Sequence, residues 1–180
     1  MKIITLCSII ILLFTSCQND PKESKIKKYF DLKTIIEQQI KQLDTQKPTV
    51  KKIITIGQTT ENQTIKISDW TKELELFTQA DLNKPAYLNS YLIDSTADEI
   101  KYTIKTEEHL PVKYLTILRP NGSGIRIEAL INTSNYLYES EKRVTLILEK
   151  NHLIAYQIDG FQKVVFGDKK SFKINGTVVR

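Results

Sequence analysis

The stretch IRIEALINTSNYLYESEKRVTLILEKNHLIAYQI, Ile125–Ile158, alternates apolar and polar residues over most of its length. Every second residue is apolar in three runs, around Ile127, Leu146 and Tyr156. A period of two is typical of a β-strand with one buried face, because successive side chains point to opposite faces. Lys150-Asn151 separates two of these runs and leaves room only for a tight turn. Strands joined by tight turns run antiparallel, so the stretch predicts an antiparallel meander.

The same alternation continues on both sides of this stretch. Ile100–Ile104 and Val112–Leu118 precede it and predict two more strands. Further turns are expected at four short polar segments: Asn121-Gly122, Asp159-Gly160, Gly167–Lys170 and Asn175-Gly176. Asn-Gly and Asp-Gly pairs are typical of hairpin turns, because both central residues there need a positive φ. We therefore expect the meander to continue to the end of the chain.

The first part of the chain has a helical period instead. Before Pro48, apolar residues recur three or four positions apart: Leu32, Ile36, Ile40 and Leu43, with Ile35 alongside. Asp31 is a natural N-cap for this amphipathic helix, and Pro48 ends it. Core packing is the more common role of such a helix, although a helix that binds a partner would show the same pattern.

A hairpin and a second helix are predicted next. Two β-branched runs, Val50–Ile56 and Thr64–Ile67, flank a polar turn region over Gly57–Gln63. Ser68 or Asp69 then caps a helix that ends at Asn83-Lys84-Pro85. One face of this helix carries apolar residues, namely Trp70, Leu74 and Phe77.

Together these patterns define an α+β fold in which N-terminal amphipathic helices pack on a long, curled antiparallel β-meander. A twisted meander of this length curls or closes, and a half-barrel is one such form. In its order of elements the chain resembles the half-barrel of periplasmic lipoprotein carriers, although no motif supports this likeness. Residues 29–180 have the length of a single domain. If the helices leave part of the sheet uncovered, a concave apolar surface remains for a ligand.

The start of the chain has the features of an export signal. Lys2 precedes a nearly continuous apolar run, Ile3–Phe14, which as a helix would span about 18 Å, well short of the ~30 Å hydrocarbon core. The run ends in Phe14-Thr15-Ser16-Cys17, which resembles the lipobox of bacterial lipoproteins, with Phe14 in place of the usual leucine. The alternative is an ordinary signal peptide that ends in a cysteine.

The resemblance implies cleavage before Cys17 and attachment of a diacylglycerol to its thiol and an acyl chain to its amine. Residues 1–16 would then be a signal peptide, and residues 17–28 a lipidated, flexible tether. One acyl chain holds a protein on a membrane only marginally, whereas two or three form a lasting anchor. In this family, Gln18 in place of an aspartate after the cysteine implies the outer membrane. No other cofactor is expected.

Composition limits the remaining possibilities. The chain has 180 residues, of which 41% are hydrophobic and 26% charged, as in ordinary globular domains. Cys7 and Cys17 both lie in the signal region, so the fold forms no disulfide. The net charge is +5, but basic and acidic residues are interleaved, which argues against a nucleic-acid partner. Lysines gather at Lys22–Lys28, where they either contact anionic headgroups or are simply solvated.

Candidate binding residues are aromatic. Tyr136 and Tyr138 are placed on one strand face, where stacking and hydroxyl contacts could bind a sugar or peptide. Trp70, the one tryptophan, is a further candidate ligand residue, although sealing a helix against the sheet is its default role. Ordinary cross-strand packing accounts for the tyrosines as well.

No catalytic or metal constellation is visible in the sequence. His109 and His152 are far apart and no cysteine lies near them, so no metal site is expected. Ser123 lies in a glycine-rich stretch between two predicted strands, which is typical of a hairpin loop and not of a nucleophile elbow. Two adjacent acidic pairs, Asp98-Glu99 and Glu107-Glu108, leave open a hydrolase that uses carboxylates.

One short motif points to modification. Asp94-Ser95-Thr96 resembles the acceptor motif for O-glycosylation of exported proteins in some anaerobic gut bacteria, which implies an exposed Ser95.

These observations predict a non-enzymatic lipoprotein of the cell envelope, held in the outer membrane on its periplasmic or surface side. Its expected partners are the membrane, through the anchor, and either an envelope protein or an apolar ligand. The alternatives are an envelope hydrolase and a protein that resembles carriers of lipids or lipoproteins.

Overall fold

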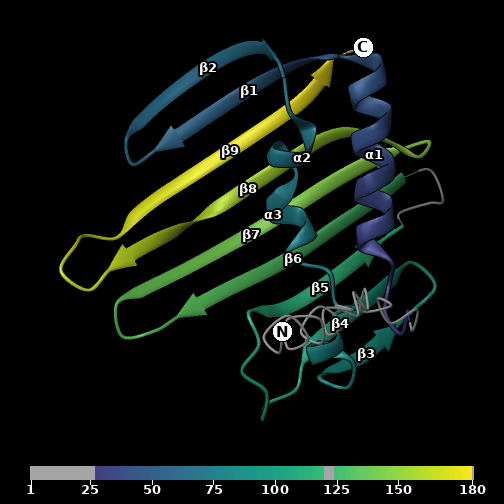
Figure 1. Ribbon diagram of the computed structural model, residues 1–180, viewed down its shortest axis with the longest axis vertical. Coiled ribbons are helices and arrows are strands. Elements are labelled where there is room, and N and C mark those ends of the chain that lie inside the picture. Colours follow the sequence, from purple (N-terminus) through teal and green to yellow (C-terminus); the bar gives the residue numbers. More distant parts are fainter. Residues whose placement is uncertain (1–26, 120–123, 180) are drawn as a thin grey trace, which may run out of the picture.

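An open antiparallel sheet of nine strands dominates the computed structural model, which describes residues 27–119 and 124–179 (Figure 1). The strands are β1 (Thr49–Ile56), β2 (Thr59–Lys66), β3 (Tyr91–Ser95), β4 (Glu99–Ile104), β5 (Val112–Leu118), β6 (Gly124–Ser134), β7 (Tyr138–Glu149), β8 (His152–Val164) and β9 (Lys170–Val179). Their order is β2-β1-β9-β8-β7-β6-β5-β4-β3. Strands β4 to β9 therefore form the predicted meander, β3 is an edge strand that was not individually predicted, and the β1–β2 hairpin is added beside β9.

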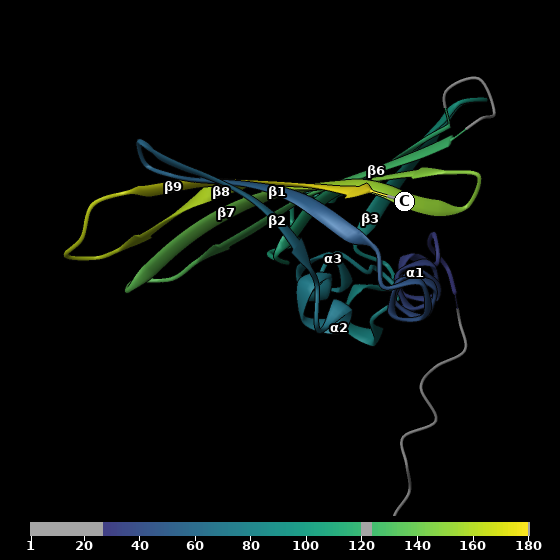
Figure 2. The ribbon, with the colours of Figure 1, turned by 90° about the horizontal axis from the view of Figure 1, so that it is seen from above.

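The helices lie together on one face of the sheet, as Figure 2 shows. They are α1 (Leu32–Gln46), α2 (Trp70–Glu73) and α3 (Glu75–Thr78), and a 3-10 helix η1 (Pro85–Tyr87) precedes β3. Helices early in the chain and a long antiparallel sheet after them agree with the predicted α+β architecture. The predicted second helix is broken in two, because the backbone of Leu74 (φ −99°, ψ 5°) leaves the helical region.

Helix α1 begins and ends as predicted, but its buried face differs. Asp31 accepts a hydrogen bond from the backbone N–H of Thr34, and Lys47 closes the other end in the left-handed conformation (φ 47°). The buried residues are Leu32, Ile36, Gln39 and Leu43, so Gln39 occupies a core position while Ile40 is only half-buried.

Gln39 can be buried because both ends of its amide are hydrogen-bonded. Its Nε2 donates to the carbonyl of Asn151 (3.2 Å), and its Oε1 accepts from the N–H of Leu153 (2.7 Å). Helix α1 is thereby joined to the β7–β8 turn at Lys150-Asn151. That turn was predicted, and both of its residues have positive φ (47° and 62°).

Two of the predicted turns are wrong. Asp159-Gly160 lies inside β8, and Asn175-Gly176 lies inside β9. A Cβ at Gly160 would lie 2.0 Å from the carbonyl oxygen of Glu141, and one at Gly176 would lie 2.1 Å from Cζ of Tyr156. These glycines are present because other atoms approach the strand closely, which is the second common role of glycine in a sheet.

The remaining turn predictions differ in detail. The β1–β2 turn is only Gly57-Gln58, because β2 starts at Thr59, and Gly57 has a φ of 59°. The polar residues of β2 are exposed at the edge of the sheet, so an apolar pattern did not mark them as a strand. The turn before β9 lies at 165–169, close to its predicted place. Asn121-Gly122 and Ser123 lie outside the described residues.

The core lies between the helices and the sheet. Trp70 is 1% exposed, and Tyr156, Leu74 and Phe77 are also buried. Tyrosines fill the end nearest β3 and β4, where the Tyr29 ring contacts the rings of Tyr91 and Tyr102 edge-on, with centroids 5.7 and 5.5 Å apart. Packing, and not ligand binding, therefore accounts for the tyrosines in this part of the β-rich region.

Candidate functional site

An apolar groove lies where the sheet extends past its helices. It has a volume of about 250 Å³ and is lined by Ile54, Ile56, Gln162, Lys170, Ser171, Phe172 and Ile174. The strands that form it, β1, β8 and β9, continue toward one end of the sheet where no helix lies over them (Figure 1). We call this feature the apolar groove.

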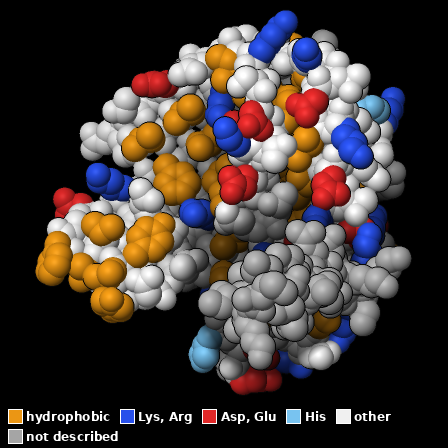
Figure 3. Space-filling view, in the orientation of Figure 1, with side chains coloured by type: hydrophobic (Ala, Val, Ile, Leu, Met, Phe, Trp, Pro, Cys, Tyr) orange, Lys and Arg blue, Asp and Glu red, His pale blue; other side chains and the backbone are white. Residues whose placement is uncertain are grey.

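The strand register gathers these side chains on one face. Ile54 pairs with Ile174, and Ile56 pairs with Phe172, so four large apolar side chains form two adjacent cross-strand pairs. Ile54 shares its strand face with Val50, which is fully buried in the core. The groove is therefore a continuation of the core-facing surface beyond the helices, and apolar side chains are visible over this end in Figure 3.

Two turns at this end carry further exposed apolar side chains. Tyr136 and Leu137 belong to the β6–β7 turn, and Val165 and Phe166 to the β8–β9 turn. Phe166 is 99% exposed and Tyr136 is 86% exposed. We call these four residues together with Val164, which is 55% exposed at the end of β8, the apolar tip.

The predicted ligand residues are only partly brought together. Tyr136 lies in the turn, and Tyr138 is half-buried as the first residue of β7, so the two remain neighbours at this end of the sheet. Trp70 is buried in the core under the helices instead. The groove residues themselves were missed, because they alternate in the same way as core residues and the sequence does not show where the helices stop covering the sheet.

A second hollow, of about 360 Å³, lies between α1 and the segment after α3. It is lined by Lys33, Glu37, Thr78, Asp81, Asn83, Lys84 and Pro85. Asp81 is 6% exposed, and its Oδ1 has no hydrogen-bond partner among the described residues. Burial raises the pKa of the Asp81 carboxyl, and it lowers the pKa of the Lys84 ammonium.

The raised pKa of Asp81 predicts that the free energy of unfolding depends on pH. Because the pKa is higher in the folded chain, the folded state holds the proton more tightly, and stability falls as pH rises from the ordinary aspartate range through the folded value. The stability of Asp81→Asn minus that of the parent should therefore increase with pH. Urea unfolding at several pH values between about 4 and about 7 measures this difference. Both proteins contain the same neighbouring charged residues, namely Lys84, Asp31, Lys33 and Glu37. A difference in stability that does not change with pH would contradict the prediction.

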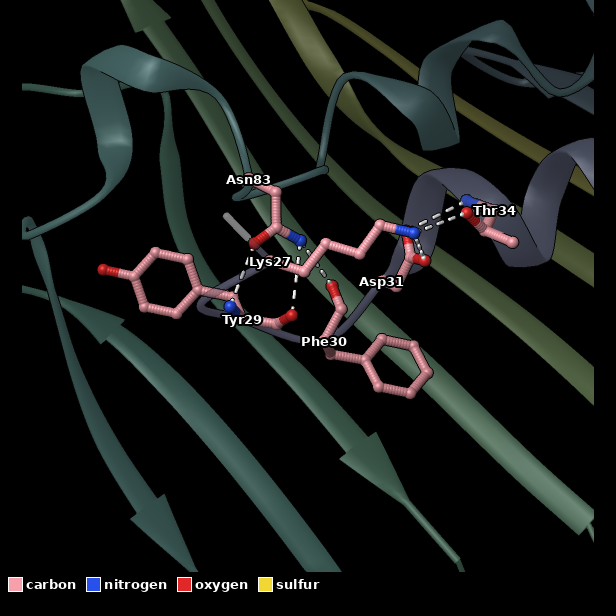
Figure 4. A network of polar contacts seen from close by, with 6 residues as sticks. All are labelled: Lys27, Tyr29, Phe30, Asp31, Thr34 and Asn83. Atoms are coloured by element: carbon pink, nitrogen blue, oxygen red, sulfur yellow. Dashed lines mark hydrogen bonds and ion pairs between the residues drawn. The ribbon is translucent and has the colours of Figure 1, made fainter. Parts of the chain in front are cut away.

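The polar side of this hollow fixes the start of the fold (Figure 4). The Asn83 side chain accepts from the N–H of Tyr29 (2.9 Å) and donates to the carbonyls of Tyr29 (3.3 Å) and Phe30 (3.1 Å). Beside it, Lys27 pairs with Asp31 and donates to the hydroxyl of Thr34 (3.3 Å). Asn83 thus fixes the segment that leads into α1 by hydrogen bonds, and these contacts indicate a structural role for the hollow.

A partly buried polar cluster joins α2 to the sheet. Lys52 of β1 donates to both carboxylate oxygens of Glu73 (2.7 and 3.0 Å), and the Tyr156 hydroxyl donates to Glu73 as well. Burial and the hydrogen bond to this carboxylate raise the pKa of Tyr156. The three groups line neither the apolar groove nor the hollow beside α1, and their mutual contacts fit a structural role.

The other predicted positions that the structure describes are separate from the groove. Cys17 lies outside the described residues. Ser95 is exposed at the end of edge strand β3, as an acceptor of glycosylation would have to be. His109 is exposed, and Nδ1 of His152 lies 2.8 Å from the carbonyl oxygen of Lys150. Within residues 27–119 and 124–179, no group of three His, Cys, Asp or Glu residues could hold a metal ion.

Comparison with protein-family models, curated proteins and solved structures finds no match for this chain. Among the described helices, none has the length and apolar character needed to cross a bilayer.

Proposed function

We propose that this chain is a non-enzymatic, lipid-anchored protein of the cell envelope that binds an apolar ligand in the apolar groove. Cys17 would carry the anchor, and the outer membrane, on its periplasmic or surface side, would be its location. The ligand class that suits the groove is a hydrocarbon chain or the apolar side chains of an envelope partner.

One observation carries the proposal: the core-facing surface of the sheet remains apolar where the helices end. Ile54, Ile56, Phe172 and Ile174 line the groove, and Ile56 is 60% exposed. Exposed apolar side chains that form a contiguous patch beside a hollow mark interaction sites more often than isolated ones do. An open sheet with helices on one face also supports the half-barrel likeness to lipid or lipoprotein carriers.

The groove can be tested with a matched pair of variants. The material is the chain from residue 17 with Cys17→Ser, which retains every described strand and helix, and the measurement is a fluorescent fatty acid titration. Ile56→Asp places a charge in the groove and should weaken binding at least about tenfold, because a carboxylate is costly to bury beside a hydrocarbon chain. Ile53→Asp is the control, since Ile53 is 43% exposed on the opposite face of the same strand.

Equal affinities of the two variants, or no fatty acid binding by the parent chain, would contradict hydrocarbon binding in the groove. A parent chain that binds no fatty acid but captures an envelope protein through the groove would leave the partner version of the proposal in place, provided that Ile56→Asp abolishes capture and Ile53→Asp does not.

The anchor is tested separately, in cells that process lipoproteins. Cys17→Ser should release the chain from the membrane fraction and abolish incorporation of labelled palmitate. Unchanged fractionation together with unchanged processing of the precursor would exclude lipidation at Cys17. The groove experiment does not depend on this result.

A further inference from the structure

The apolar tip is a protrusion, and its two turns support one another. The N–H of Val165 donates to the carbonyl of Leu137 (2.9 Å), which joins the β8–β9 turn to the β6–β7 turn. Within the β6–β7 turn, the Asn135 side chain accepts hydrogen bonds from the N–H groups of Leu137 and Tyr138, both at 2.9 Å. The exposed apolar side chains are thus presented by hydrogen-bonded turns.

The burial at the tip shows that no described residue of the chain covers it. Phe166 is 99% exposed, and the other four tip residues are between 50% and 86% exposed. Five large exposed apolar side chains at one end of the sheet cost solvation free energy, so a surface of this kind normally has an occupant. A hollow of about 190 Å³ between the two turns is lined by Tyr136, Leu137, Val164 and Val165 among others, but Phe166 does not line it, so an occupant must also surround Phe166.

Charged residues around the tip favour a negatively charged occupant. Lys163, Lys169 and Lys170 are exposed at the end of β8 and the start of β9, and Glu139 and Asp168 are exposed near them, which leaves one net positive charge among these five residues. The Lys169 ammonium lies 3.5 Å from the centre of the Phe161 ring. Aromatic and aliphatic side chains bordered by lysines match the interfacial zone of a bilayer, where the rings enter the headgroup layer and ammonium groups contact phosphates.

The tip is also continuous with the apolar groove. Gln162 and Lys170 are partners in the β8–β9 register and line the groove, and the tip residue Val164 lies two positions beyond Gln162 on the same strand face. The tip therefore borders the end of the groove at Gln162 and Lys170, beyond which lie Phe172 and Ile174.

We propose that the apolar tip inserts into the interface of a bilayer that contains anionic phospholipid, so that the open end of the groove faces the acyl chains. This inference rests on the proposed envelope location and extends the proposed binding role: the tip would be the entry through which a hydrocarbon chain reaches the groove.

The experiment measures binding of the chain from residue 17, with Cys17→Ser, to vesicles by sedimentation. The vesicles contain phosphatidylglycerol with phosphatidylethanolamine, or phosphatidylcholine alone. Val165→Ser combined with Phe166→Ser should lower partitioning onto the anionic vesicles at least about tenfold. The control is Leu92→Ser combined with Ile93→Ser, which removes two apolar side chains of 59% and 52% exposure from β3 and should change partitioning less than about twofold.

A second measurement tests insertion itself. Phe166→Trp places a tryptophan at the tip, whereas the natural Trp70 is buried in the core. Brominated lipids should quench the fluorescence of the new tryptophan and leave that of the parent chain nearly unchanged. Tip and control variants that bind vesicles equally, or an unquenched signal from the Phe166→Trp variant on bound vesicles, would overturn the proposal.

Three further outcomes separate this inference from its alternatives. Lipid-free self-association that the tip substitutions abolish would assign the tip to a second copy of the chain and overturn membrane insertion. If the tip variant loses vesicle binding but still binds the soluble fatty acid, the tip contacts the membrane and the groove binds the ligand, as proposed. If the parent binds vesicles and no fatty acid, hydrocarbon binding in the groove fails and the tip stands.

Discussion

Replacing Gly176 with alanine is expected to lower the free energy of unfolding by about 3 kcal/mol, the upper part of the usual range for overpacking a core. The added Cβ would lie 2.1 Å from Cζ and 2.5 Å from the hydroxyl oxygen of Tyr156. Tyr156 cannot easily move away, because it is 1% exposed, contacts Phe77 edge-on and donates a hydrogen bond to Glu73. Urea unfolding of the parent and the variant measures the loss.

Two companion variants make this result specific. Thr177→Ala alters the next residue of β9, which is exposed, and should change stability by less than about 0.5 kcal/mol. Combining Gly176→Ala with Tyr156→Leu removes the ring that the new methyl group meets, so the two effects should be strongly non-additive. Additive losses would show that the strain at Gly176 does not come from Tyr156.

Replacing Lys52 with methionine should cost about 3 kcal/mol, because it breaks a largely buried ion pair. The side chains of Lys52 and Glu73 are only 14% and 16% exposed, so the substitution leaves a carboxylate without its cation in a poorly solvated place. Removing one partner of a buried ion pair usually destabilises a protein much more than removing both. Because Lys52 and Glu73 remain partly exposed, we expect a loss at the lower end of the usual range of destabilisation. Thermal or urea unfolding at neutral pH gives the measurement.

The double variant Lys52→Met with Glu73→Gln provides the control. A neutral glutamine needs no cation, and its carbonyl oxygen can still accept the hydrogen bond of the Tyr156 hydroxyl. Most of the lost stability should therefore return. A double variant no more stable than Lys52→Met alone would show that lysine packing, and not its charge, is what matters.

The spacing of apolar residues and the helix-capping residues predicted the strands and helices of this fold well. The residues typical of turns predicted the positions of the turns less reliably. Alternation gave the strands of the meander, and Asp31 and Pro48 gave the limits of α1. The glycines after Asp159 and Asn175 were assigned to turns, because a sequence does not distinguish a glycine that needs positive φ from one that leaves room for a neighbour. Gly176 depends on Tyr156, which is distant in the chain and adjacent only in the folded sheet.

The candidate site was harder to predict for a similar reason. Ile54 and Phe172 have the same spacing as core residues such as Val144 and Leu146, and nothing in the local pattern shows that helices cover only one of the two sets. Gln39 was missed for the opposite reason. It is polar, so the apolar pattern did not mark it as buried, although its two hydrogen bonds allow it to be a core residue. Whether an apolar strand face is buried or exposed depends on how far α1 to α3 extend over the sheet.

The position of β9 has a consequence for how the chain reaches this structure. Strand β9 pairs with β1 on one side and β8 on the other, so the early hairpin joins the sheet only through residues that are made after β3 to β8. Pairings between segments so distant in sequence form slowly, because loop closure must precede them. Before β9 docks, β1 and β8 both expose an unpaired edge. The nascent chain should therefore stay incompletely folded and open to chaperones until β9 has been made.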